Sequence, residues 1–259
     1  MVLMSRKRLL LLIVFAFSLL VAGCVFAHRP IPLSTDSGEN LAGKIEQSIN
    51  KKAWEETCII SWRFAGAEHI WDKCREFHLY KRGTNIVQHS LAGKGGIHIH
   101  NGEETSTPQK WITKAYNAWI NDSFWLNPLV KLRDQGVELG SLRYDGQKTL
   151  LVHYTTGGNT PGDRFLWFFD DQYRPTMWRM WVSIIPIGGI SSSWEGWQQL
   201  STGAWVATKH SLGPLTLDLS PVHGAKHWSE LYREDPFSAL IQKNPLLTEE
   251  EEPRDKTVP

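Results

Sequence analysis

Alternating apolar and polar positions recur along most of the chain after residue 56, and they predict short β-strands. In CIISWRF, apolar residues fall at every second position from Cys58 to Phe64, as expected when one face of a strand is buried. Turns rich in Gly and polar residues separate further segments of this kind, so we expect about eleven strands. These segments are IWDKCREFHLY, TNIVQHSL, GIHIHNG, VELGSLRY, KTLLVHYT, DRFLWFFD, TMWRMWVS, SSSWEGWQQL, AWVATKHSL and PLTLDLS.

Two segments have helical spacing instead. Between Leu41 and Trp54, apolar residues recur close to every fourth position, which predicts an amphipathic helix. A second helix is expected in STPQKWITKAYNAWINDSFWLNP, where Pro108 would occupy the first helical position and Asn127-Pro128 would end the helix. This second helix interrupts the series of strands without a linker that would mark a domain boundary.

The order of these elements restricts the fold class. Strands and helices do not alternate, which excludes a doubly wound parallel sheet and favours a mainly β (α+β) fold with one strongly curved antiparallel sheet. We expect one domain over residues 38–235, preceded by a tether over 24–37 and followed by a C-terminal tail over 236–259. The tail ends in LTEEEEPRDKTVP, a charged segment with the composition of disordered chain.

The N-terminus has the features of a signal peptide over residues 1–23. Arg6-Lys7-Arg8 precedes an apolar run from Leu9 to Gly23 that is short for a membrane span. Small residues before Cys24 resemble a bacterial lipobox, whose cysteine is lipid-modified and attaches the protein to a membrane. The alternative is cleavage after Ala27, which would release a secreted or periplasmic soluble protein.

The location that we expect is the cell envelope. Val25, not Asp, follows the candidate lipidation site, and by analogy with the enteric sorting rule this favours the outer membrane, with the domain facing the periplasm. Lys and Arg number 28 and Asp and Glu 27, with no basic stripe, so nucleic acid is not expected as a partner.

Cys58 and Cys74 remain as an even pair in an oxidising compartment. A turn centred on Gly66 would place the two cysteines opposite each other, but it would also set Asp72 beside Ile60 on an apolar face. A one-residue slip would pair Trp71 with Trp62 and send Cys74 to the other face. A disulfide and two separate buried thiols therefore both stay open.

His98 and His100 in GIHIHNGEE are the main candidates for chemistry. Two residues apart on a strand, their imidazoles leave the same face about 7 Å apart, a spacing that occurs in zinc and iron sites. The third ligand is not fixed by the sequence. The alternative is a solvent-facing pair beside buried Ile97 and Ile99.

Other catalytic signatures are missing from the sequence. It contains no P-loop, dinucleotide fingerprint, Cys-x-x-Cys or Gly-x-Ser-x-Gly motif. We therefore expect no cofactor and a protein that is not an enzyme. A metal-dependent hydrolase that uses His98 and His100 is the alternative.

An aromatic hairpin carries a resemblance to a known fold. The segment FLWFFDDQYRPTMWRMW is similar to a strand–turn–strand segment of the LolA/LolB-like envelope carriers. EHIWDK, GNTPGDRFLWF and SSWEGWQQLSTGAWVATKH resemble an uncharacterised bacterial branch with that fold. Over residues 38–222 the resemblance implies an unclosed β-barrel with helices over its mouth.

This resemblance implies a ligand-binding face. In an open barrel one face of the hairpin would line a concave interior that can take an apolar ligand, either a lipid or the acyl part of a lipoprotein. The residues expected on that face are Phe165, Trp167, Phe169, Trp178 and Met180. Two alternatives stay open: a solid core with the same residues, and a non-enzymatic module that binds another envelope protein.

Overall fold

The protein is represented by a computed structural model that describes residues 6–27, 29–34, 36–93, 95–185 and 187–247. Two large antiparallel sheets dominate it. In spatial order, the first sheet contains β1 (Asp36–Ser37), β8 (Val137–Tyr144), β9 (Gln147–Tyr154), β10 (Arg164–Phe169), β11 (Pro175–Trp181) and β12 (Ile190–Ser193). The second sheet contains β17 (His223–Ala225), β2 (Ile59–Phe64), β3 (Ala67–Asp72), β4 (Phe77–Arg82), β5 (Asn85–Ser90), β6 (Gly96–His100) and β7 (Glu103–Glu104).

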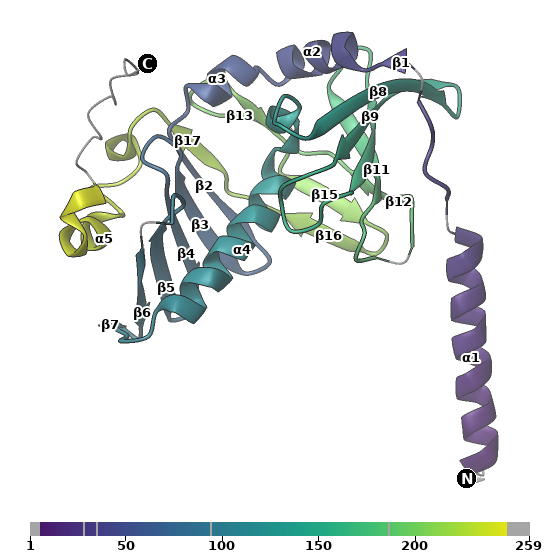
Figure 1. The fold of residues 1–259 in the computed structure, drawn as a ribbon, viewed down its shortest axis with the longest axis horizontal. Coiled ribbons are helices and arrows are strands. Elements are labelled where there is room, and N and C mark those ends of the chain that lie inside the picture. The colour runs from purple at the N-terminus through teal and green to yellow at the C-terminus, as the bar shows by residue number, and fades with distance from the viewer. Residues whose placement is uncertain (1–5, 28, 35, 94, 186, 248–259) are drawn as a thin grey trace, which may run out of the picture.

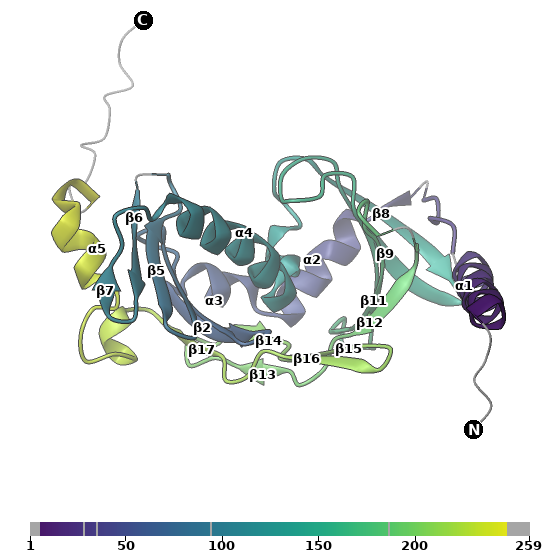
Figure 2. The same ribbon diagram turned by 90° about the horizontal axis from the view of Figure 1, so that it is seen from below.

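Two short hairpins connect the sheets along one side (Figure 2). They are β13 (Gln198–Gln199) with β14 (Trp205–Val206), and β15 (Lys209–Leu212) with β16 (Leu215–Asp218). The Ser211 amide donates to Ser193 Oγ (2.9 Å), which ties β15 to β12. The Arg63 amide donates to the Leu219 carbonyl (3.1 Å), which ties the end of the second hairpin to β2. The sheets are not closed into a barrel, and the mainly β, antiparallel and unclosed fold class predicted from the sequence is confirmed. The single curved sheet that was expected is instead divided into two large sheets.

The helices lie between and beside the sheets (Figures 1 and 2). They are α1 (Arg6–Ala27), α2 (Glu39–Ser48), α3 (Lys51–Glu55), α4 (Gln109–Leu126) and α5 (Ser238–Lys243), with 3-10 turns η1 (Pro128–Lys131), η2 (Trp228–Glu230) and η3 (Pro245–Leu247). α4 crosses the space between the two sheets. Its Ala115 is fully buried in one cluster with Tyr80 and Val87 of the second sheet. α4 begins at Gln109, one residue later than expected, so Pro108 lies directly before the helix and not at its first position.

Both faces of the β10–β11 hairpin are buried, which explains its unusual composition. On the inner face Trp167 and Trp178 belong to the largest core cluster. On the outer face Leu166, Phe168 and Trp181 form a separate cluster. The Trp181 indole N–H donates to the Arg29 carbonyl (2.6 Å), so the segment before β1 lies against this outer face. Two packed faces require apolar residues at successive positions of the strand.

The cysteine pair forms a disulfide in the structure, with Cα atoms 5.1 Å apart. The registers considered from the sequence are both wrong, because a two-residue turn at Ala65-Gly66 pairs Trp62 with His69. The segment IWDKCREFHLY is not one strand but a hairpin, with Cys74 in the turn between β3 and β4. Because Cys74 lies in a turn, its side chain is not restricted to one face of a strand and can reach Cys58, which comes directly before β2.

The segment after residue 235, expected as a tail, begins as part of the fold. Phe237 and Leu240 are fully buried in one cluster with Phe77 of the second sheet. Arg75 fastens the start of this segment through a bidentate pair with Asp235 (2.6 and 3.0 Å). Residues 248–259 lie outside the described residues.

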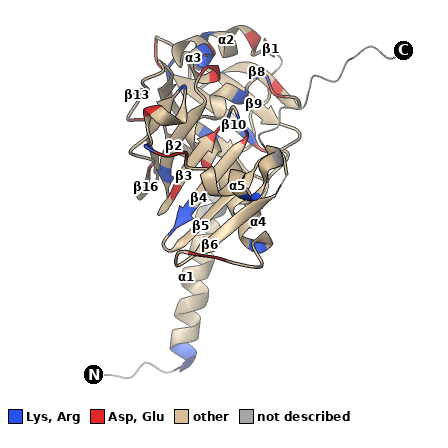
Figure 3. Ribbon diagram, turned by 90° about the vertical axis from the view of Figure 1, so that its left-hand side faces the viewer, with Lys and Arg blue, Asp and Glu red and all other residues tan. Residues whose placement is uncertain are grey.

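Charged residues are interspersed over the surface that Figure 3 presents. Lys and Arg lie among Asp and Glu on the strands and helices drawn there, and several form exposed pairs such as Lys81 with Glu68 (3.5 Å). Exposed pairs of this kind contribute at most about 1 kcal/mol each. The fold is therefore held by its aromatic clusters more than by surface charge.

Candidate apolar binding site

A cavity of about 390 Å³ lies between the C-terminal half of α4 and the inner face of the first sheet. Aromatic side chains form its walls. They are Phe124 and Trp125 from α4, Tyr154 from β9, Phe165 from β10 and Trp178 from β11, with Met180 beside them. The volume falls in the range of small-molecule sites, which are also lined mainly by apolar and aromatic groups.

Ring contacts hold these walls in place. Trp178 is the centre of the group: its ring lies 4.7 Å from Phe165, 4.9 Å from Trp125 and 5.9 Å from Phe124. Aromatic pairs at these separations are worth about 0.5–1.5 kcal/mol beyond their burial. The walls are thus fixed by contacts among themselves before any ligand enters.

Polar groups gather at the rim of the cavity. Lys131 is the last residue of η1, Asp134 and Gln135 follow it, and Asn121 belongs to α4. Tyr154 reaches from the wall and donates its hydroxyl to the Pro128 carbonyl (3.4 Å). Burial, with a smaller contribution from Asp134, raises the pKa of Tyr154 well above its usual value, so the phenol stays neutral.

Asp163 is a buried carboxylate on the rim. Thr160 donates its hydroxyl to one carboxylate oxygen, and the Ser183 amide donates to the other (2.9 Å). These two bonds connect the loop before β10 with the segment after β11, which both border the cavity. Asp163 therefore acts as a structural tie at the entrance.

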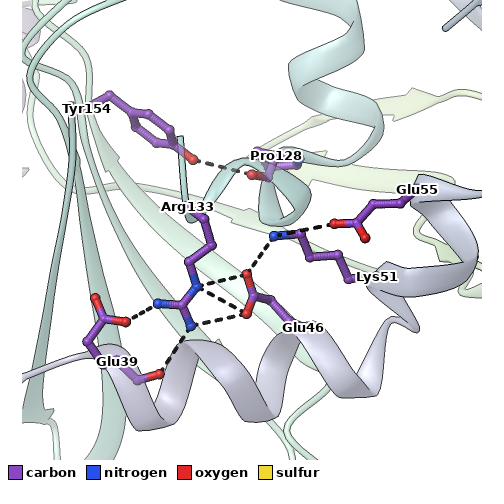
Figure 4. A network of polar contacts seen from close by, with 7 residues as sticks. All are labelled: Glu39, Glu46, Lys51, Glu55, Pro128, Arg133 and Tyr154. Atoms are coloured by element: carbon purple, nitrogen blue, oxygen red, sulfur yellow. Dashed lines mark hydrogen bonds and ion pairs between the residues drawn. The ribbon is translucent and has the colours of Figure 1, made fainter. Parts of the chain in front are cut away.

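A charged network fixes the rim segment to α2 (Figure 4). Arg133 pairs with Glu39 and with Glu46, whose Oε2 lies 3.1 Å from the guanidinium. Lys51 lies 3.0 Å from the second oxygen of Glu46 and 3.9 Å from Glu55. Because Arg133 lies between Lys131 and Asp134, this network holds the polar rim against the helix that covers the first sheet.

The residues predicted to bind the ligand separate into two groups. Phe165, Trp178 and Met180 line the cavity. Trp167 does not, because it lies fully buried with its ring 4.9 Å from Trp194. Phe169 does not either, because the strand is irregular between Phe168 and Phe169 and the Phe169 ring stacks on Tyr173 (5.7 Å).

Three walls of the cavity were not anticipated from the sequence. Phe124 and Trp125 sit at the end of α4, and Tyr154 at the end of β9. The available signal was the adjacent aromatic pair before Asn127-Pro128. Trp111, Ala115 and Trp119 recur at every fourth position of the same segment, and the aromatic pair lies off the stripe that they form.

The candidate metal ligands are engaged in other contacts. His98 is buried, not solvent-facing, and contacts Thr105 Oγ1 and Asn85 Oδ1 at 3.0 Å each. Its ring stacks on Trp111 of α4 (4.7 Å). His100 is exposed and contacts the same Asn85 oxygen (3.0 Å). Within the described residues, no group of three or more His, Cys, Asp or Glu side chains is arranged to hold a metal.

The candidate lipidation site cannot be placed as a side chain. Cys24 belongs to α1, but its side chain lies outside the described part of the structure. Across the described ranges, no helix combines the length and the hydropathy that crossing a membrane requires. Lipidation therefore stays a prediction.

No family model matches the chain, and no curated protein matches it. Among solved structures the chain is similar to a DUF1329 family protein from Desulfovibrio piger, with a TM-score of 0.37 and 11% sequence identity. That similarity covers 77% of this chain and 98% of the other. Because the TM-score is low, we draw nothing from it about fold or function.

Proposed function

We propose that this chain is a lipid-anchored protein of the cell envelope that binds an apolar ligand beneath α4. The ligand is a lipid or the acyl part of a lipoprotein, as in LolA-like carriers. The observation that supports this function is the aromatic cavity of about 390 Å³ on the inner face of the first sheet. On this proposal the protein acts by binding and carries no catalytic residue.

The chemistry of the walls favours an apolar ligand over water. Cavities lined by apolar side chains stay dry and accept apolar molecules, since a buried water needs two to four polar partners. Phe124, Phe165 and Met180 offer none. Filling such a space gains roughly 25 cal/mol for each Å² of apolar surface removed from water.

Lys131 is the rim residue that suits a ligand with an acidic head group. Lys131 borders the cavity and forms no ion pair within the described part of the chain; its ammonium lies 6.0 Å from the Trp119 ring. An unpaired ammonium beside an apolar cavity suits an amphiphile whose carboxylate or phosphate stays at the mouth.

A filling substitution tests the site. Val182→Trp adds an indole at a residue that lines the cavity, while Leu215→Trp adds the same group at an exposed position, with 67% of Leu215 accessible, outside it. We expect a fluorescent fatty acid to bind the unaltered protein and the Leu215→Trp control equally. Val182→Trp should weaken binding at least tenfold with an unchanged denaturant midpoint.

Two outcomes would refute the proposal. One is no binding of the fluorescent fatty acid by the unaltered protein, together with no lipid in native mass spectra of protein purified from membranes. The other is equal binding by both Trp variants, which would place the ligand elsewhere. Either result would favour the alternative of an interaction module, in which the aromatic face is only core.

A further inference from the structure

Two segments that are far apart in the chain meet at one end of the first sheet. One is residues 29–34, which follow α1, and the other is the loop between β11 and β12. The Arg29 amide donates to the Gly188 carbonyl (3.3 Å), and Trp181 at the end of β11 donates its indole N–H to the Arg29 carbonyl (2.6 Å). A side chain at Gly189 would not fit, because its Cβ would lie 2.7 Å from the Arg29 Cβ. The two segments are therefore packed directly against each other.

The cavity reaches the surface at this same end of the sheet. Arg164 at the start of β10 is opposite both His153 and Trp181, so the ends of β9 and β11 lie beside the start of β10. Ile184, in the loop that follows β11, borders the cavity, yet 76% of it is exposed. A residue with both properties lies at the mouth of the cavity. The loop between β11 and β12 therefore forms part of that mouth.

This loop has an unusual composition for a surface segment. From Val182 to Gly189 it reads VSIIPIGG, without a charged residue and with three isoleucines. Ile185 and Ile187 are half-buried, whereas Ile184 is largely exposed. Single exposed apolar residues are common on proteins, but apolar residues that are exposed together mark an interaction site or a membrane contact.

The short segment that follows α1 adds further exposed apolar side chains. Leu33 is 90% exposed and Ile31 is 39% exposed. Leu33 and Ile184 are the two most exposed large hydrophobic side chains in the described part of the chain. Leu33 and Ile31 border a groove on the outer face of the sheet together with His153 and Arg164, which lie at the same strand ends. Exposed aliphatic groups therefore occur both at the cavity mouth and beside it.

The chain keeps this end of the sheet close to the candidate lipidation site. Arg29 comes five residues after Cys24, and five residues of chain span at most about 18 Å. Arg29 is itself fixed to β11 and to the apolar loop. An acylated Cys24 would therefore hold the mouth of the cavity near the membrane surface, while the second sheet lies at the opposite end of the molecule from α1 (Figure 1).

We propose that the apolar side chains at this end of the first sheet form a membrane-docking surface, which turns the mouth of the cavity toward the lipid bilayer. They are Ile31, Leu33, Ile184, Ile185 and Ile187. This inference rests on the proposed lipid anchor at Cys24 and deepens the proposed function, because it gives the route of the ligand. An acyl chain passes from the bilayer into the cavity beside Ile184 without crossing bulk water.

The anchor and the docking surface support each other physically. A segment at the membrane interface binds in proportion to the apolar area that it buries, and a few aliphatic side chains bury too little to hold a protein by themselves. Once an anchor holds the domain at the membrane, docking becomes intramolecular and a small apolar surface suffices. Because the loop from Val182 to Gly189 carries no charge, its side chains can enter the interface without desolvating an ion.

Fluorescence quenching by membrane lipids tests the docking surface in the intact protein. With the disulfide formed and Cys24 acylated, Ile184→Cys or Leu33→Cys supplies a free thiol that can carry an environment-sensitive fluorophore. The matched control is Thr84→Cys, at an exposed turn position between β4 and β5 of the second sheet. Each labelled protein is reconstituted through its anchor into vesicles of phosphatidylethanolamine and phosphatidylglycerol, which contain lipid that is spin-labelled near the top of its acyl chains.

Quenching should be at least twofold greater for the labels at Ile184 and Leu33 than for the label at Thr84. Equal quenching at the three positions would overturn the inference, and so would an unquenched label at Ile184, which would assign the apolar loop to a protein partner. Mass spectrometry of the same samples and fatty-acid titration report separately on the proposed function. Quenching without fatty-acid binding would refute only the carrier role, whereas acylated Cys24 without quenching would refute only the docking surface. A protein without lipid on Cys24 would refute the anchor and this inference with it.

Discussion

Trp167 and Trp178 face each other across β10 and β11, with ring centroids 5.0 Å apart and both side chains fully buried. Of the two residues, only Trp178 borders the cavity. Trp167 does not border the cavity and packs against Trp194. The Trp178 indole therefore separates a packed core from a space that a ligand can occupy. Both alternatives raised by the sequence, core and cavity, are present on one face of one hairpin.

Shortening Trp167 should be costly because its surroundings are packed on all sides. We expect Trp167→Ala to lower the free energy of unfolding by about 3–5 kcal/mol, the usual cost of removing a large core aromatic. Urea titration followed by circular dichroism measures this change. A loss below about 1.5 kcal/mol would mean that the Trp167 site is not a solid core.

Phe124→Ala is the matched change on the cavity wall. Phe124 is only partly buried, so we expect a smaller loss, about 1–2 kcal/mol, because the side chain already borders empty space. Affinity for a fluorescent fatty acid should change at least tenfold. If binding is unaffected while stability falls as far as in Trp167→Ala, Phe124 belongs to the core and not to a ligand site.

The sequence predicts that these two tryptophans lie on the same face of the sheet, but it does not predict the cavity. The two-residue period of strands assigns Phe165 and Trp167 to one face, and the short turn pairs Trp167 with Trp178. Which of them borders a space depends on where α4 crosses the sheet. That crossing is set by contacts between residues far apart in the chain, such as Trp125 with Trp178.

The disulfide gives a prediction about the unfolded chain. Cys58 and Cys74 are separated by 16 residues, and closing a loop of about this length stabilises a fold by roughly 3 kcal/mol. The double variant Cys58→Ala with Cys74→Ala should lose about that much in urea titrations. Adding dithiothreitol should destabilise the unaltered protein to a similar extent and leave the variant unchanged.

The cysteine pair also illustrates how local geometry limits sequence interpretation. Even pairing in an oxidising compartment favoured a bond, but neither the register centred on Gly66 nor the register slipped by one residue was right. Ala65 and Glu76 both have positive φ angles (46° and 57°), which fix two tight turns that side-chain periodicity does not indicate. The burial of Phe237 also depends on a distant contact, because it packs against Phe77, 160 residues away in the sequence.

Membrane attachment is predicted to depend on Cys24. A cysteine that carries two acyl chains anchors a protein stably to a membrane, whereas a single apolar patch does not. Cys24→Ala should therefore move the protein from the membrane pellet to the soluble fraction after a salt wash. Fractionation followed by immunoblotting measures this shift, with Cys58→Ala as a control that leaves Cys24 intact. Continued sedimentation of Cys24→Ala would rule out the lipid anchor.

His210 should make the fold sensitive to acid. It is fully buried beside the aromatic core, with its ring 4.2 Å from Trp194, and Nδ1 contacts the Ser193 carbonyl at 3.1 Å. Nδ1 therefore carries the proton, and the buried Nε2 lacks a hydrogen-bond partner within the described residues. Burial lowers the pKa of His210 to about 4, despite opposing contributions from Ser193, Trp125 and Glu195.

The direction of the pH effect follows from this lowered pKa. As pH falls below about 6.5, the unfolded chain binds a proton at His210 that the folded chain does not. Stability should then decline until about pH 4, by at most about 3 kcal/mol from this residue. His210→Gln removes the titrating group, so the free-energy difference between pH 7 and pH 4.5 should be smaller in the variant. Parallel urea titrations at the two pH values measure that difference, and an equal acid loss in both proteins would show that His210 is not protonated on unfolding.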